Sequence, residues 1–132
     1  MTDNHLEENA KPPLISIIMA AYNAEAYVAE AVNSVMEQTF PDWELIVVDD
    51  GSTDRTAALI RDTARGDQRV RLITQDNSGY PAIARNVGLA AARGRYLCFL
   101  DADDRYATNR LELALHTFSK HPGVGVVFHD MY

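Results

Sequence analysis

Short runs of apolar, often β-branched residues alternate along this chain with stretches of helical periodicity. The first run, residues 14–19, has no wide polar gaps, which is typical of a strand covered on both faces. Further runs of this kind occupy residues 43–48, 70–74, 95–100 and 124–128. Strands and helices in such alternation predict an α/β fold, in which a mostly parallel sheet carries helices on both faces.

The segments between these runs carry helix signals. Residues 24–38 repeat apolar side chains at a 3.6-residue period, and similar patterns follow the second, third and fourth runs. The residues expected to start or end the helices are Asn23 for the first, Ser52 or Thr53 for the second, Pro81 and Gly94 for the third, and Asn109 with Glu112, as a capping box, for a fourth that ends near Lys120.

Composition narrows the class of protein. A chain of 132 residues with 47% apolar and 23% charged side chains fits one globular domain, which we place at residues 14–132 after a disordered tail over 1–13. The net charge of −7 argues against a nucleic-acid partner, and no apolar run approaches the ~20 residues of a membrane span. With a single cysteine and no signal peptide, we expect a cytoplasmic protein.

Aspartates follow two of the predicted strands at the point where each ends. These are Asp49 and Asp50 after one strand, and Asp101, Asp103 and Asp104 after another. Aspartate is common in turns, so a structural role is one interpretation. Because the carboxyl ends of parallel strands share one sheet edge, these side chains would also repel one another, by about 4 kcal/mol for a pair 4 Å apart at an effective dielectric constant of 20. A divalent cation such as Mg²⁺ or Mn²⁺, bridging to a substrate diphosphate, would relieve that repulsion.

The usual phosphate-binding loops are absent from the sequence. Neither G-x-x-x-x-G-K-[ST] nor G-x-G-x-x-G occurs, which argues against a P-loop NTPase or a dinucleotide dehydrogenase. A diphosphate would then depend on the metal, on Arg85, and on backbone amides near Gly79. Taken alone, Arg85 fits a surface residue of a helix better than a phosphate ligand.

Four segments together resemble the family 2 glycosyltransferases, which have the GT-A fold. Residues 15–23 are similar to the opening strand and loop of that family, and residues 34–54 to its second block. Asn77-Ser78-Gly79 with residues 84–88 resembles the third block, and residues 99–104 resemble its D-x-D motif. The resemblance extends over about residues 14–130 and implies a Rossmann-like, nucleotide-diphospho-sugar-binding half of a GT-A fold.

The resemblance also assigns residue roles. It implies that the loop after the first strand holds base and ribose, that Tyr22 stacks on the base, that Glu25 reaches the ribose, and that Asp50 accepts the N3–H of uracil. Asp101 would contact the ribose, Asp103 would bind Mn²⁺ or Mg²⁺, and Arg85 would face the phosphates. The residues expected to bind the nucleotide sugar are thus Ala20, Ala21, Tyr22, Glu25, Asp50, Gly79, Arg85, Asp101 and Asp103.

Two features depart from the family pattern. Ala20 stands where a proline is usual, and the chain ends at Tyr132, before the acceptor-binding half and the catalytic base of inverting members are expected. Asp130 precedes the place of that base. We therefore expect a donor-binding part of an inverting glycosyltransferase that uses a UDP-sugar and a glycan, lipid or other acceptor. If half of the fold is absent, exposed apolar surface predicts a homo-oligomer.

Two other classes of protein fit parts of the pattern. A non-catalytic nucleotide-binding or assembly module would use the same fold without transfer. An aspartate-based phosphoryl-transfer domain would share the acidic strand ends, but it needs a lysine near them, and Lys11 and Lys120 are badly placed. A haloacid-dehalogenase-like phosphatase is disfavoured because Arg105 stands where D-x-D-x-[TV] needs Thr or Val.

Overall fold

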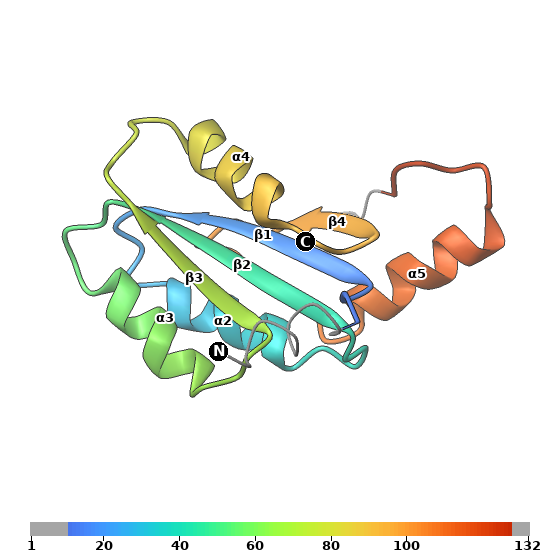
Figure 1. Ribbon diagram of the computed structural model, residues 1–132. Helices are drawn as coiled ribbons and strands as arrows, with labels where there is room; N and C mark the ends of the chain where they lie inside the picture. Colours follow the sequence, from blue (N-terminus) through green and yellow to red (C-terminus); the bar gives the residue numbers. More distant parts are fainter. Residues whose placement is uncertain (1–10, 128–132) are drawn as a thin grey trace, which may run out of the picture.

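Parallel strands form the central layer of the molecule. The computed structural model describes residues 11–127, and its sheet has the strand order β3-β2-β1-β4 with every neighbouring pair parallel (Figure 1). The strands are β1 (Ile15–Ala21), β2 (Trp43–Asp50), β3 (Val70–Gln75) and β4 (Tyr96–Phe99). The mostly parallel α/β fold predicted from the sequence is therefore confirmed.

Both faces of the two central strands are buried. Ile17 of β1 and Leu45 of β2 lie in a core cluster with side chains of α2 (Val28–Met36) and α3 (Thr56–Ala64). Ile18 and Ile46, one residue further along each strand, face the opposite way into a cluster with α4 (Pro81–Ala91). Successive residues of a strand point to opposite faces, so burial of both sets explains why these strands read as unbroken apolar runs.

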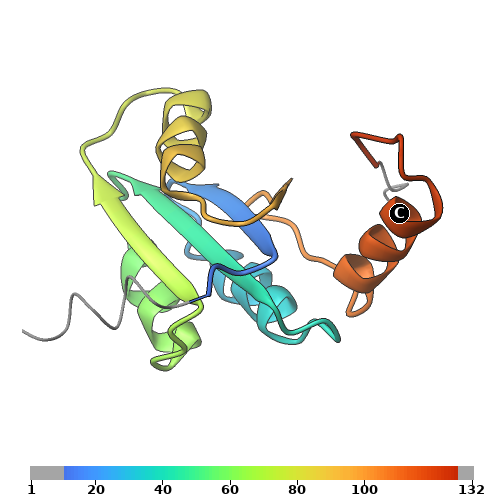
Figure 2. The ribbon, with the colours of Figure 1, turned by 45° about the vertical axis from the view of Figure 1, so that its right-hand side comes forward.

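The helices lie on opposite sides of the sheet. Figure 1 shows α2 and α3 below the strands and α4 above them. The fourth helix, α5 (Arg110–Lys120), lies to the side and is seen apart from the strands in Figure 2, with Leu111 reaching the cluster on the α2 face. None of the helices within residues 11–127 combines the length and the apolar character that a membrane span requires.

Several helix ends differ from those predicted. The α2 helix begins at Val28 and not after Asn23, whose backbone is left-handed with φ 47°. The α3 helix begins at Thr56, whose N–H donates to the Asp54 carboxylate at 2.9 Å. Neither of the predicted caps, Ser52 and Thr53, accepts this hydrogen bond. In both places the side chains of the preceding loop bond across to a neighbouring loop, which outweighs a local cap.

The later elements also depart in part from expectation. The α4 helix starts at Pro81 as predicted but ends at Ala91, and Gly94 instead packs against the backbone of Ser16. Asn109 precedes α5, yet no side-chain capping box forms, because Glu112 accepts a hydrogen bond from Thr39 at 2.7 Å.

The predictions for the two ends of the chain fall only in part on the described residues. Residues 124–127 of the fifth predicted strand are not a strand, and Phe128 lies outside the described residues. Residues 1–10 of the predicted tail and Asp130 also lie outside them. Leu97 and Phe99 of β4 are half-exposed, which is the kind of apolar surface on which the homo-oligomer prediction rests; the oligomer itself stays a prediction.

A buried carboxylate ties the sheet to the segment after α4, at the amino ends of the strands. Glu44 is 2% exposed and accepts hydrogen bonds from the Ser16 hydroxyl at 2.7 Å and from the Arg93 N–H at 2.8 Å. The Arg93 guanidinium lies 3.1 Å and the Arg71 guanidinium 3.7 Å from its other oxygen. Burial alone would raise the pKa of Glu44, but these hydrogen bonds and cations outweigh it and the net shift lowers the pKa.

We therefore expect the acid stability of the fold to depend on Glu44. A lowered pKa in the folded state means that this group stabilises the fold above the unfolded-state pKa, near 4.5, and that the contribution is lost as pH falls through the folded-state pKa. Glu44→Gln should lower the free energy of unfolding at pH 7, where its charged partners lose their counter-ion, and should flatten the decline of stability below pH 4.5.

Urea unfolding measured from pH 7 to pH 3 checks this expectation. Glu37→Gln, which changes an exposed carboxylate at the end of α2, is the matched control and should reproduce the wild-type pH profile. An unchanged pH profile in Glu44→Gln would show that the buried carboxylate does not control acid stability.

Candidate functional site: a cleft at the carboxyl ends of the strands

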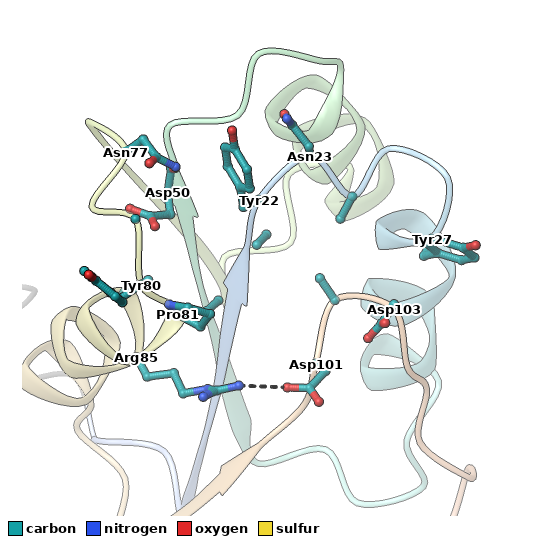
Figure 3. A pocket seen from close by; sticks show the side chains of 16 residues that line it. Tyr22, Asn23, Tyr27, Asp50, Asn77, Tyr80, Pro81, Arg85, Asp101 and Asp103 are labelled. Carbon is teal, nitrogen blue, oxygen red and sulfur yellow. Dashed lines mark hydrogen bonds and ion pairs between the residues drawn. The ribbon is translucent and has the colours of Figure 1, made fainter.

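The loops that follow the strands enclose an open cleft of about 620 Å³ (Figure 3). It lies where the strand order reverses: β2 and β3 follow β1 on one side, and β4 pairs with β1 on the other. In parallel α/β sheets ligands bind at such a switch point. The residues that line the cleft are Ala20, Ala21, Tyr22, Asn23, Ala24, Tyr27, Asp50, Asn77, Gly79, Tyr80, Pro81, Ala84, Arg85, Asp101, Ala102 and Asp103.

This lining contains every residue that the sequence predicted for nucleotide-sugar binding, except Glu25. The Glu25 carboxylate instead accepts the backbone N–H of Arg55 at 3.1 Å and so ties the loop after β1 to the start of α3. Asp50 and Asp103 line the same cleft although 53 residues separate them in the sequence. The structure thus brings the predicted residues together, while their roles in binding stay predictions.

Asp50 is the most constrained acid of the cleft. Its side chain accepts hydrogen bonds from the Gln75 amide at 2.8 Å, from the Ser78 N–H at 2.9 Å and from the Ser78 hydroxyl at 2.8 Å. Burial acts to raise the pKa of Asp50, but these three donors outweigh it and lower the pKa, so the group is a carboxylate at neutral pH. Asp50 therefore presents acceptor oxygens only, and it also fixes the loop after β3.

Gly51 lets that loop approach β2 closely. Its φ is +75°, and a Cβ at this position would lie 2.5 Å from the backbone nitrogen of Asn77. The Asn77 amide in turn donates to the Asp50 carbonyl at 2.9 Å. A residue with a side chain at position 51 would push the two loops apart, which explains why Asp50 is followed by glycine.

The loop after β1 is bonded to the loop after β2. The Asn23 N–H donates to the Ser52 hydroxyl at 2.9 Å, and the Asn23 side-chain oxygen accepts the Thr53 N–H at 2.9 Å. The Ala24 N–H donates to the Thr56 hydroxyl at 2.8 Å. Side chains that looked like helix caps in the sequence therefore hold the wall of the cleft that carries Tyr22.

An ion pair crosses the floor of the cleft. The Arg85 guanidinium, from α4, lies 3.2 Å from the Asp101 carboxylate (Figure 3). Arg85 is 42% exposed and Asp101 63% exposed, and pairs this open to solvent contribute only about 0–1 kcal/mol. Asp101 is therefore a partner that Arg85 can exchange for another anion at little cost.

The other aspartates differ in what they face. Asp103 lines the cleft and makes no hydrogen bond or ion pair with another side chain of residues 11–127. Asp49 lies outside the cleft and accepts the Ser52 N–H at 3.2 Å, in line with the structural role considered from the sequence. Asp104 accepts the N–H of Arg105 at 2.9 Å. The five aspartates therefore do not form one cluster.

The residues present fit a metal that is shared with a ligand. Within residues 11–127, no three His, Cys, Asp or Glu side chains gather into a preformed ligand set. The cleft does hold three carboxylates, Asp50, Asp101 and Asp103, against one guanidinium. Mg²⁺ and Mn²⁺ sites of nucleotide enzymes commonly use one or two carboxylates and complete the shell with phosphate oxygens. Asp103 meets that requirement because its oxygens are exposed and uncommitted.

Sequence reasoning did not assign two tyrosines of the cleft rim and an asparagine of its wall to the site. Tyr27 and Tyr80 are 56% and 67% exposed at its rim, and Asn77 lines the wall beside Asp50 (Figure 3). Asn77 belongs to a motif already singled out, and Tyr80 precedes the helix-starting Pro81, so both could have been inferred from their position after β3. Tyr27 carried no signal beyond helical periodicity.

Comparison with known proteins identifies the family. The model of the glycosyl transferase family 2 matches residues 16–130, so the chain belongs to that family. One relative, the UDP-Glc:alpha-D-GlcNAc-diphosphoundecaprenol beta-1,3-glucosyltransferase WfgD of Escherichia coli, is 40% identical over 107 residues, which are 81% of this chain and 42% of that enzyme. The chain spans less than half the length of the curated relatives it matches.

Solved structures agree with the fold. S. aureus TarS 1-349 in complex with UDP-GlcNAc matches with a TM-score of 0.78 and 32% identity over 87% of this chain and 37% of that chain. The mannosyltransferase PcManGT from Pyrobaculum calidifontis, in complex with GDP-Man and Mn²⁺, matches with a TM-score of 0.75 and 27% identity over 83% of this chain and 33% of that chain. These two likenesses support the GT-A fold predicted from the sequence.

The close approach of Gly51 to Asn77 yields a stability prediction. Gly51→Ala should lower the free energy of unfolding by about 2–4 kcal/mol, because a left-handed backbone costs about 1 kcal/mol for alanine and the overlap with the Asn77 backbone adds to it. Gly66→Ala is the matched control, since Gly66 has φ +77° but no atom within 4 Å of an added Cβ. Urea unfolding of both variants measures the difference, and equal losses would mean that the two loops separate freely.

Proposed function

We propose that this chain is the donor-binding part of a glycosyltransferase that takes its sugar from a UDP-sugar with the help of a divalent cation. The observation that carries the proposal is the composition of the cleft. One cavity at the switch point of the sheet joins an aromatic rim, an anionic acceptor at Asp50, a cation at Arg85 and an uncommitted carboxylate at Asp103. Family membership favours transfer with inversion, which forms part of this proposal.

The base of the nucleotide would bind between Asp50 and Tyr22. A buried carboxylate that is charged at neutral pH suits a ligand that offers an N–H, as uracil does at N3. Tyr22 is 54% exposed on the neighbouring loop, so its ring is available for stacking, which is worth about 1–3 kcal/mol per base. The side-chain bonds that fix Asn23 and Ser78 would keep these two groups in place before the ligand arrives.

The diphosphate would bind on the floor of the cleft beside Arg85. A phosphate oxygen is a better partner for a guanidinium than the half-exposed Asp101, since it brings more charge and a bidentate geometry. Release from Arg85 would free Asp101 to accept a ribose hydroxyl. Exchange of the Arg85 partner from Asp101 to a phosphate would therefore serve two predicted contacts, that of Arg85 with the diphosphate and that of Asp101 with the ribose.

Charge balance supports the metal. Asp50, Asp101 and Asp103 already exceed the one guanidinium of the cleft, so a diphosphate would add like charge to an acidic site. Asp103 would hold Mg²⁺ or Mn²⁺ together with diphosphate oxygens. When bound, the ion would neutralise the negative charge of the departing nucleotide diphosphate.

The choice of donor rests on two lines of support. Asp50 suits a base with an N–H donor, and the names of similar proteins include a UDP-Glc-dependent glucosyltransferase and a structure with UDP-GlcNAc. A structure with GDP-Man and Mn²⁺ also stands among the neighbours, and guanine likewise offers an N–H. We favour uridine because Oδ1 of Asp50 already accepts two hydrogen bonds and Oδ2 only one, which leaves Oδ2 as the single acceptor that the uracil N3–H needs.

Calorimetric titration with UDP, with and without Mn²⁺, tests the role of Asp103. Mn²⁺ should strengthen UDP binding to the wild-type chain, and Asp103→Ala should weaken binding in Mn²⁺ by at least about tenfold. Because Asp103 is exposed and makes no hydrogen bond or ion pair with another side chain of residues 11–127, the free energy of unfolding should change by no more than about 0.5 kcal/mol.

Asp42→Ala provides the control for that titration, because Asp42 is an exposed aspartate before β2, at the far end of the sheet. It should bind UDP and Mn²⁺ as the wild type does. Wild-type strength of Mn²⁺-dependent binding in Asp103→Ala would contradict the metal assignment, and absence of UDP binding by the wild-type chain would contradict the proposed function.

Base selectivity tests the role of Asp50. The wild-type chain should bind UDP more tightly than CDP, because cytosine has an acceptor at N3 where uracil has a donor. Asp50→Asn offers an amide N–H in place of a carboxylate oxygen, so the ratio of the two affinities should fall by at least about tenfold. Competition binding with both nucleotides measures the ratio, and an unchanged ratio would place the base elsewhere.

A further inference from the structure

The loop after β4 alternates buried anchors with exposed carboxylates. Leu100, Ala102 and Tyr106 are 4%, 8% and 7% exposed and belong to the core cluster on the α2 face. Asp101 and Asp103, between and beside these anchors, are exposed and line the cleft. The apolar anchors therefore decide where the carboxylates stand, since Asp103 has no side-chain partner among residues 11–127 to hold it.

Tyr106 closes this loop on itself. Its hydroxyl donates to the carbonyl of Phe99, the last residue of β4, so residues 99–106 form a closed loop that contains Asp101 and Asp103, two of the three cleft carboxylates. Within this closed loop, a turn forms in which the Asp104 N–H donates to the Asp101 carbonyl at 3.0 Å. Burial is the main cause of the raised pKa of Tyr106, which keeps the hydroxyl protonated and able to donate.

Two buried polar side chains, Ser34 of α2 and Gln38 just after that helix, hold this closed loop and the residues that follow it. The Tyr106 N–H donates to the Ser34 hydroxyl at 3.0 Å, and that hydroxyl donates to the Ala31 carbonyl at 2.7 Å. Gln38 donates to the Ala107 carbonyl at 2.7 Å and accepts the Leu111 N–H at 3.1 Å. Ser34 and Gln38 are each 8% exposed, so their polar groups need partners, which are residues 106–111 and the backbone of α2.

We propose that Tyr106, whose backbone N–H is hydrogen-bonded to Ser34, is a positioning residue that holds Asp103 in place for the divalent cation. The proposal rests on the proposed function, because it assigns the loop geometry to the metal that Asp103 would share with a diphosphate. A displacement of about 1 Å at a ligating oxygen matters for a metal site, whereas an exposed loop without such a ligand tolerates it. The tyrosine hydroxyl and the serine hydroxyl therefore act on the site without touching the ligand.

Tyr106→Phe tests the proposal, because it removes one hydroxyl and keeps the buried aromatic side chain. The measured quantity is the factor by which Mn²⁺ strengthens UDP binding to the 132-residue chain, determined by calorimetry. This factor should fall by about 3- to 10-fold in Tyr106→Phe, the loss expected for one hydrogen bond, while UDP affinity without metal falls by less. Ser34→Ala should change the same factor in the same direction.

Tyr96→Phe is the matched control. Tyr96 lies on β4 and packs against Phe118, and within residues 11–127 its hydroxyl makes no hydrogen bond. It should keep the wild-type factor. An unchanged factor in Tyr106→Phe would overturn the positioning role. If UDP binding weakened equally with and without Mn²⁺, the factor would be unchanged and the cleft would have loosened as a whole.

Failure of the proposed function would look different. If the wild-type chain showed no Mn²⁺-dependent strengthening of UDP binding, both the proposed function and the positioning role would fall. If the wild type showed it and Tyr106→Phe matched the wild type, only the positioning role would be wrong.

Hydrogen exchange of the ligand-free protein gives a second readout. The Asp104 N–H, which donates to the Asp101 carbonyl within the closed loop, should exchange about 3- to 10-fold faster in Tyr106→Phe than in the wild type. Amides of β2, such as Val47, should exchange at unchanged rates. Unchanged exchange at Asp104 would show that the hydroxyl does not order the loop and would overturn the proposal.

Discussion

Parallel pairing of β1 with both β2 and β4 is the constraint on which the site depends. Because β1 lies between its two partners, β2 and β4 run about 10 Å apart, two strand spacings, and Asp50 and the Asp101–Asp103 segment follow them at the same edge of the sheet. The pairing is enforced by burial of both faces of β1 and β2. A slip of one residue would turn Ile17 and Ile18 to the wrong clusters.

The loops beyond that edge are fixed mainly by bonds to one another. Asn23 joins the first loop to the second, Asp50 joins the second to the third, and Tyr106 fastens the fourth to β4 and α2. Such a site is largely formed before a ligand binds, so less ordering opposes binding. The exposed Arg85–Asp101 pair is the weak point of the arrangement, and it lies where a diphosphate would enter.

The sequence predicted the fold and the site to different depths. Apolar runs located the strands, and the Asp50 and Asp103 motifs located the cleft, because strand ends in a parallel sheet converge whatever the helices do. Helix starts were predicted less well: Asn23 and Glu112 have the right side chains for caps but bond to residues distant in sequence. The anchoring role of Tyr106 could not be predicted, since its hydroxyl bond depends on the path of a loop that has no periodic pattern.

The most direct test of the account is a crystal structure of this chain with UDP and Mn²⁺, in which anomalous scattering locates the metal. The account predicts a manganese peak within ligand distance of an Asp103 oxygen, diphosphate oxygens completing its shell, and the uracil N3–H on Asp50. A metal bound away from Asp103, or a nucleotide bound outside the cleft between β2 and β4, would contradict it.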